Sequence, residues 1–358
     1  MNLLIFFLFL LVVFWAFERF YLRGGGVANY PVPDDPEALR VFADGQVSGP
    51  LQKAVIHTVE ELISQIATAV NKHQLKKARA AFDSVSDGRK YPSEFRPVDA
   101  GGVPAEWVLA PGSDPARRVL YIHGGGFIMG SPRSHRTFTS KFSEVTGCSV
   151  LAIDYRLMPE HKHMDCIDDC RTTYQWILEN GPDGASETRQ LFFGGDSAGG
   201  NLVLSLVAWV RDNGFRAPDA VVAMSPLTDI TFSGASMRTN KSTDVMLKPM
   251  IGILTRLPQF IKSWWVFWTY HVRPANPIAS PLLGDLSRLP PTLVQASEAE
   301  MLLDDARRYV CKACASGSPA RLQTWTGMVH IFQIFDPHLP QAGEAWEEIG
   351  KFIVSQGE

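Results

Sequence analysis

Short apolar segments alternate with helical stretches over most of this chain, and that alternation most constrains the fold. Seven segments predict strands, at 106–109, 119–122, 150–153, 191–193, 220–224, 292–295 and 321–325. Five helices are predicted among and after the later ones, at 136–147, 164–180, 198–213, 301–315 and 342–355. This alternation favours a mostly parallel sheet with helices on both faces. We therefore expect the chemistry beyond the carboxyl ends of the strands.

One serine stands between glycines where a predicted strand meets a predicted helix, in the segment QLFFGGDSAGGNLVL at 190–204. Within it, GDSAG at 195–199 matches G-x-S-x-G, a sharp turn that needs small residues two positions from the serine. The turn holds the serine in a strained conformation above the sheet, and the helix that starts there directs its N–H groups to the same place. The pattern predicts Ser197 as a nucleophile.

A glycine-rich loop follows an earlier predicted strand, in RVLYIHGGGF at 118–127. Such an HGGG-type loop can bring bare backbone N–H groups to the oxyanion that an attacking serine creates. We expect Gly125, Gly126 and the N–H of Ala198 to form this oxyanion hole. The alternatives are a flexible loop or a phosphate-binding loop, but the Lys-Ser/Thr ending of a phosphate loop is missing.

A base and an acid should follow the serine in the order acid, histidine. His330 comes directly after the final predicted strand, where its imidazole could take the proton of Ser197. For the acid, Glu298 and Glu300 both lie in a loop after a predicted strand, whereas two aspartates at 304 and 305 lie a turn into the next helix. The residue pattern leaves Glu298 and Glu300 as equal candidates.

Four motifs resemble the hormone-sensitive lipase-like (bacterial family IV) esterases and occur in that family's order. They are HGGGF at 123–127, DYRLMPEH at 154–161, GDSAGGNL at 195–202 and GMVHIFQIF at 327–335. The resemblance spans about residues 95–355 and implies an α/β-hydrolase fold, with a mostly parallel eight-stranded sheet, helices on both faces and a helical cap. The family's Asp-x-Leu-x-Asp segment corresponds to EMLLD at 300–304, so the resemblance selects Glu300, although the family usually has aspartate there.

The resemblance also implies an activity. It predicts a serine hydrolase of short- to medium-chain carboxylic esters that works through a Ser197-His330-Glu300 triad and an acyl-enzyme, with a small apolar ester as substrate and no metal or cofactor. Hydrolysis of lactones or arylacetamides in the same site is an alternative, as is a non-catalytic ligand-binding receptor. Receptors of this fold lose the nucleophile or the histidine, and both are present here.

The amino end carries a different signal. As a helix, residues 3–22 would rise about 30 Å, the thickness of a bilayer's hydrocarbon core. We expect a single-pass membrane anchor over 1–23, and the alternatives are a signal peptide or a buried hydrophobic arm. A signal peptide typically has a basic amino end and a cleavage site of small residues, and neither is present. Arg19 and Arg23 follow the apolar stretch, which places the folded domain on the cytoplasmic side.

Three further parts are predicted. Residues 24–94 hold a linker and two cap helices, at 55–70 and 74–82; residues 95–358 form the catalytic domain, with a cap insertion at about 226–283. The cap helices and the aromatic-rich insertion could cover the site and line an apolar acyl pocket, but ordinary core packing or bilayer contact would use the same residues.

Charge and cysteine content exclude other functions. A net charge of −3 offers no basic field, so we expect no nucleic-acid partner. The five cysteines are odd in number, and the pair at 311 and 314 has no second pair at zinc-site spacing. They are interpreted as small buried hydrophobic residues, without a metal site.

Overall fold

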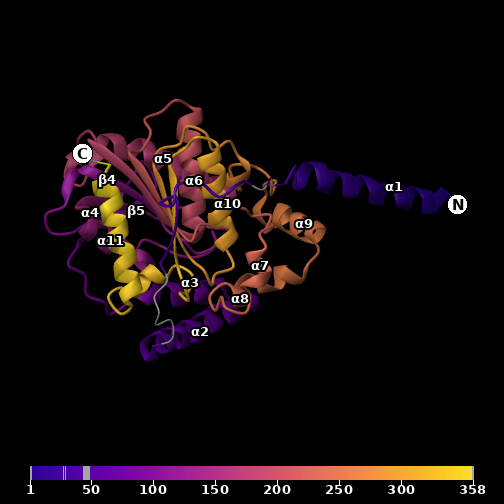
Figure 1. Cartoon of the computed structure of the whole chain (residues 1–358), viewed down its shortest axis with the longest axis horizontal. Helices are drawn as coiled ribbons and strands as arrows, with labels where there is room; N and C mark the ends of the chain where they lie inside the picture. The colour runs from indigo at the N-terminus through magenta and orange to yellow at the C-terminus, as the bar shows by residue number, and fades with distance from the viewer. Residues whose placement is uncertain (1, 27, 29, 43–48, 357–358) are drawn as a thin grey trace.

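A nine-stranded sheet forms the centre of the protein in the computed structural model, which describes residues 2–26, 28, 30–42 and 49–356 (Figure 1). The strand order is β1-β11-β10-β9-β8-β4-β5-β3-β2. The strands are β1 (Leu39–Phe42), β2 (Glu94–Asp99), β3 (Pro104–Leu109), β4 (Asp114–Ile122), β5 (Cys148–Ile153), β8 (Gln190–Asp196), β9 (Ala220–Met224), β10 (Thr292–Ser297) and β11 (Ala320–Trp325). All seven predicted strands are present, and the sheet is parallel except where β3 pairs with β2 and β5.

Helices cover both faces of this sheet, as the alternating pattern predicts (Figure 1). They are α5 (His163–Glu179), α6 (Ser197–Asp212) and α10 (Leu303–Ala315) on one face, and α4 (Arg136–Thr146) and α11 (Pro340–Val354) on the other. Because these helices cover the central strands on both sides, β5, β9 and β10 are buried at every residue.

The edge strand β1 corrects two expectations, that the sheet has eight strands and that residues 24–94 contain only a linker and two cap helices. Its four residues are exposed or only partly buried, and they pair in parallel with β11 from Leu39–Leu322 to Phe42–Trp325. The ring of Phe42 stacks on Trp325 at 4.4 Å between centroids. Such a short segment has too weak a pattern to predict a strand, and pairing with β11 supplies the missing stabilisation.

The apolar amino end forms one helical rod that projects from the body (Figure 1), made of α1 (Asn2–Ala16) and the π-helical η1 (Phe17–Leu22). Within it, Ile5–Leu22 is long and apolar enough to cross a membrane, and only 11% of this window is buried against the rest of the protein. A signal sequence would pass the same test of length and composition.

Two groups of helices lie beyond the carboxyl ends of the strands. The first is α2 (Pro50–Asn71) with α3 (Leu75–Asp83), and the second is α7 (Ser236–Thr239), α8 (Lys248–Ile251), η4 (Gly252–Arg256) and α9 (Gln259–Tyr270). The buried positions of α2 follow helical spacing and are Val59, Ile63, Ile66 and Ala67. We call these two groups the cap.

Candidate active site

Ser197 stands at the turn between β8 and α6, in a backbone conformation that side-chain-bearing residues seldom adopt. Its φ is +52°. A Cβ at Gly195 would lie 2.7 Å from the carbonyl oxygen of Gly199, and one at Gly199 would collide with the carbonyl oxygen of Ile122. The glycines of the G-x-S-x-G segment therefore let the chain turn sharply enough to expose the serine hydroxyl beyond the sheet.

The serine, histidine and glutamate predicted from the sequence lie together in a hydrogen-bonded series. Nε2 of His330 is 2.9 Å from Oγ of Ser197, and Nδ1 of His330 is 3.0 Å from Oε2 of Glu300. Three different loops supply these groups, after β8, β10 and β11, and all three open at the same end of the sheet. This arrangement can move a proton from the hydroxyl to the imidazole.

Glu298 and Glu300 point to different partners. Glu300 is fully buried against His330, whereas Oε2 of Glu298 forms an ion pair with Arg307 at 2.6 Å. The side-chain amide of Asn240 donates to the backbone carbonyls of both glutamates and so holds the loop between them. The longer side chain of a glutamate is thus accommodated at position 300 with an ordinary hydrogen-bond distance to the imidazole.

The electrostatics of the pair favour a charged histidine. Burial lowers the pKa of His330, but the hydrogen bond to Glu300 and its charge outweigh burial, so the net pKa is raised above 6.5. Burial raises the pKa of Glu300, and the same hydrogen bond works against that rise. A carboxylate at this position would stabilise an imidazolium at His330.

The glycine loop lies next to the serine. Gly125, Gly126 and Ala198 line the same cavity as Ser197 and His330. The φ of Gly125 is +116°, and a Cβ there would collide with the carbonyl oxygen of Met129, so only glycine fits. Within the described part of the chain, the N–H groups of Gly125 and Gly126 have no acceptor, which leaves them free to donate to a bound molecule.

A buried carboxylate that our sequence analysis did not single out joins this loop to the serine turn. Oδ1 of Asp196 accepts hydrogen bonds from the N–H of Gly124 at 3.1 Å and from the hydroxyl of Tyr121 at 2.8 Å. Oδ2 lies 3.4 Å from Nε2 of His135. Burial acts to raise the pKa of Asp196, but His135 and Tyr121 lower it overall, so the group is a carboxylate. The only sequence feature that could have indicated a role for Asp196 is its position directly before the serine.

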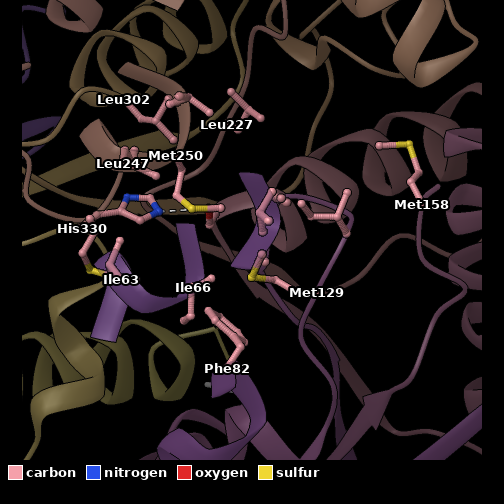
Figure 2. A pocket seen from close by; sticks show the side chains of 18 of the residues that line it. Ile63, Ile66, Phe82, Met129, Met158, Leu227, Leu247, Met250, Leu302 and His330 are labelled. Atoms are coloured by element: carbon pink, nitrogen blue, oxygen red, sulfur yellow. Dashed lines mark hydrogen bonds between the residues drawn. The ribbon is translucent and has the colours of Figure 1, made fainter. Parts of the chain in front are cut away.

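An apolar cavity of about 280 Å³ opens above the serine, between the sheet and the cap. In Figure 2, Ile63 and Ile66 of α2, Met250 of α8 and Met129, which follows the glycine loop, line the cavity that the imidazole of His330 faces. Further apolar lining comes from both cap groups and from the loops below, namely Val70, Phe82, Ile128, Met158, Leu227, Phe232, Met246, Leu247, Ile251, Trp265, Tyr270, Leu302 and Ile331.

Arg79 joins the first cap group to the loops around the site. Arg79 of α3 donates to the backbone carbonyls of Ile128 at 2.8 Å and Met158 at 2.9 Å, and both its Nη atoms contact the carboxylate of Glu160. Ile128 and Met158 both line the cavity. Arg79 therefore holds the cap helices on the part of the chain that contains the glycine loop.

Known proteins with this sequence pattern are esterases and related hydrolases. A family model described as the alpha/beta hydrolase fold matches residues 119–334. An acetyl-hydrolase of Streptomyces hygroscopicus is 35% identical over 72% of this chain and 81% of its own length. An esterase of Acinetobacter venetianus is 33% identical over 81% of this chain and 93% of its own.

Solved structures agree with these relatives. A crystal structure of an esterase from the bacterial hormone-sensitive lipase family aligns with a TM-score of 0.75 and 34% identity, over 86% of this chain and 99% of that one. The resemblance drawn from the four motifs is therefore confirmed. This chain belongs to the hormone-sensitive lipase-like esterases of the α/β-hydrolase fold, and it is a hydrolase.

Proposed function

We propose that the protein hydrolyses short- to medium-chain carboxylic esters, with Ser197 as nucleophile, His330 as general base and Glu300 as the acid that orients the histidine. The observation that carries the proposal is the hydrogen-bonded series from Ser197 through His330 to Glu300, which opens on an apolar cavity. The names of its relatives, acetyl-hydrolase and esterase, support the same reaction class.

The reaction follows from this geometry in two stages. His330 Nε2 takes the proton of Ser197 as Oγ attacks the acyl carbonyl carbon, and the carbonyl oxygen becomes an oxyanion. The N–H groups of Gly125, Gly126 and Ala198 donate to that oxyanion. His330 then gives the proton to the leaving alcohol, and an acyl-enzyme remains. In the second stage His330 activates water, which attacks the acyl carbon and releases the acid.

The cavity favours substrates of modest size. Its volume of about 280 Å³ is near the lower end of small-molecule sites, which are roughly 300–1,000 Å³. Four methionines among the lining residues can adapt to acyl groups of different shape. Short to medium acyl chains fit these dimensions, and small lactones or arylacetamides would meet the same nucleophile.

Replacing the nucleophile tests the assignment. We expect Ser197→Ala to lower kcat on p-nitrophenyl butyrate by about 10⁶-fold, as for other serine nucleophiles. Burst kinetics with the wild type and covalent labelling by a fluorophosphonate should both disappear in the variant. Equal hydrolysis by the two proteins would contradict the proposal and would leave a ligand-binding role for this cavity.

We propose that α1 and η1 form a membrane anchor and that the folded domain faces the cytoplasm. The apolar window Ile5–Leu22 supports the anchor, and Arg19 and Arg23 at its carboxyl end support the orientation. In cells, the hydrolase should stay with the membrane fraction after a carbonate wash. A protease added outside intact cells should leave the folded domain whole, and digestion of that domain would reverse the orientation.

A further inference from the structure

The cap carries exposed apolar side chains that its own packing does not use. Ile261, Trp265 and Trp268 of α9 are 45%, 40% and 67% exposed, and their spacing of four and three residues places them on one side of the helix. Ile253 of η4 is 61% exposed. We call these four residues the α9 face. A cluster of large exposed apolar side chains marks a surface that contacts a partner.

The position of the apolar rod, α1 with η1, indicates what the α9 face contacts. The ring of Trp264 on α9 lies 5.3 Å from that of Phe14 and 5.6 Å from that of Phe17, measured between centroids. Glu18 is buried and accepts a hydrogen bond from Ser263 of α9 at 2.8 Å. Helix α9 therefore lies beside the last turns of the apolar window Ile5–Leu22, and Figure 1 shows it at the root of α1.

The charge of the surrounding cap complements a membrane surface. Residues 231–275 contain six lysines and arginines and a single acidic residue, Asp244, which is buried, although the whole chain has a net charge of −3. Arg238, Lys248 and Arg256 are exposed. Tryptophan beside basic side chains is typical of the bilayer interface, where anionic headgroups attract lysine and arginine.

The cavity opens at this face. Trp265 and Thr269 of α9 and Gly126 of the glycine loop line the cavity and are exposed, so the cavity reaches the surface between α9 and that loop. We propose that the α9 face rests in the surface of the bilayer that α1 enters, and that the cavity takes its substrate from that bilayer. The substrate class is then a lipophilic acyl ester dissolved in the membrane. The inference rests on the proposed hydrolase and anchor.

The position of the face can be measured on the full chain. An environment-sensitive fluorophore would be attached to Trp268→Cys, to Phe9→Cys in α1 and to Val354→Cys on α11, each in a Cys314→Ser background because the other four cysteines are buried. Figure 1 shows the carboxyl end at the side of the body opposite α1. The protein would be reconstituted in vesicles of phosphatidylcholine and phosphatidylglycerol that contain a nitroxide-labelled lipid.

We expect quenching of the labels at 268 and 9 and none at 354. Quenching at 9 with none at 268 overturns the docking of the α9 face but leaves the anchor. An unquenched label at 9 overturns the anchor as well. The hydrolase assignment is tested separately, by Ser197→Ala in water.

A second test concerns the route of the substrate. Ile253 and Trp268 do not line the cavity, so the double change Ile253→Ser and Trp268→Ser should keep hydrolysis of dissolved p-nitrophenyl acetate within about twofold. Hydrolysis of the medium-chain ester p-nitrophenyl decanoate embedded in the vesicles should fall by about tenfold or more, because two apolar anchors are lost. The matched control, Phe215→Ser with Val354→Ser, removes two exposed apolar residues elsewhere on the protein and should change neither rate. Equal rates, or an equal loss on both esters, would overturn the proposal.

Discussion

The loops at the carboxyl ends of the strands and the cap above them are built from different interactions. Below the cavity, Ser197, His330, Glu300 and Asp196 each have polar partners at 2.8–3.4 Å. Above it, the lining side chains of the cap are apolar except Thr269, and Arg79 holds the first cap group in place. Directional bonds position the reacting atoms, whereas apolar contacts exclude water and adapt to shape. Changes below the cavity should therefore affect rate, and changes above it should affect which acyl group is accepted.

After loss of the nucleophile itself, the largest effect is expected where the carboxylate partner of the histidine is changed. Glu300→Gln should lower kcat by about 10⁴-fold, as amide replacement of a triad carboxylate does elsewhere. The general base must be neutral, so activity should fall as the pH drops through the pKa of His330, which Glu300 raises above 6.5. Without that carboxylate, burial lowers this pKa and only the smaller effects of Asp244 and Asp196 oppose it, so the midpoint of the pH–kcat/KM profile should move to lower pH.

Glu298→Gln is the matched control for this change. Glu298 pairs with Arg307 at the surface side of the loop, so its variant should keep the midpoint and most of the rate. If Glu298→Gln and Glu300→Gln exchanged these results, the acid of the series would be Glu298.

These two glutamates also show which features of the site can be predicted from the sequence alone and which cannot. The alternation of strands and helices, the serine turn and the glycine loop are local patterns, and the structure has them at the predicted positions. The choice between Glu298 and Glu300 depends on which one turns toward a histidine thirty residues later, and only the family resemblance selected it. Strand β1 and the contacts of Asp196 were not predicted for the same reason. Their partners, β11 and Gly124, are distant in sequence.

A second large effect is expected in the glycine loop. Gly125→Ala would place a Cβ against the carbonyl oxygen of Met129 in a backbone conformation with φ of +116°. The loop must shift, and its N–H donor would leave the oxyanion, so kcat should fall by about 10²- to 10³-fold. At Gly126 no atom lies within 4 Å of an added Cβ, so Gly126→Ala should lose less activity on p-nitrophenyl acetate. A greater loss at Gly126 would show that the donor geometry depends on that residue instead.

An intermediate effect is expected at Arg79, where the cap is joined to the loops at the carboxyl ends of the strands. Arg79→Met removes the bonds to Ile128 and Met158 and frees the cap to move, so kcat/KM should fall by about tenfold, or about 1.4 kcal/mol. Arg79→Lys keeps the charge but not the forked donors of the guanidinium group, so its kcat/KM should stay close to that of Arg79→Met. Glu160→Gln keeps both carbonyl contacts and should cost less than Arg79→Met. Equal losses in the two variants would mean that the ion pair, rather than the carbonyl contacts, holds the cap.

The smallest effect on rate should come from the apolar cap, and it should depend on the substrate. Met250 of α8 lines the cavity but makes no polar contact with the serine or the histidine. Met250→Ala enlarges the cavity, so a longer acyl chain can bury more of its length, at about 0.8 kcal/mol for each methylene. In a series of p-nitrophenyl esters, kcat/KM should rise by about fourfold for each added methylene that the new space accepts, while the acetate is hydrolysed as before. Met250→Leu conserves volume and should keep the wild-type profile. A uniform loss across all chain lengths would mean that Met250 positions the reacting groups, and the division between polar loops and apolar cap would then fail at this residue.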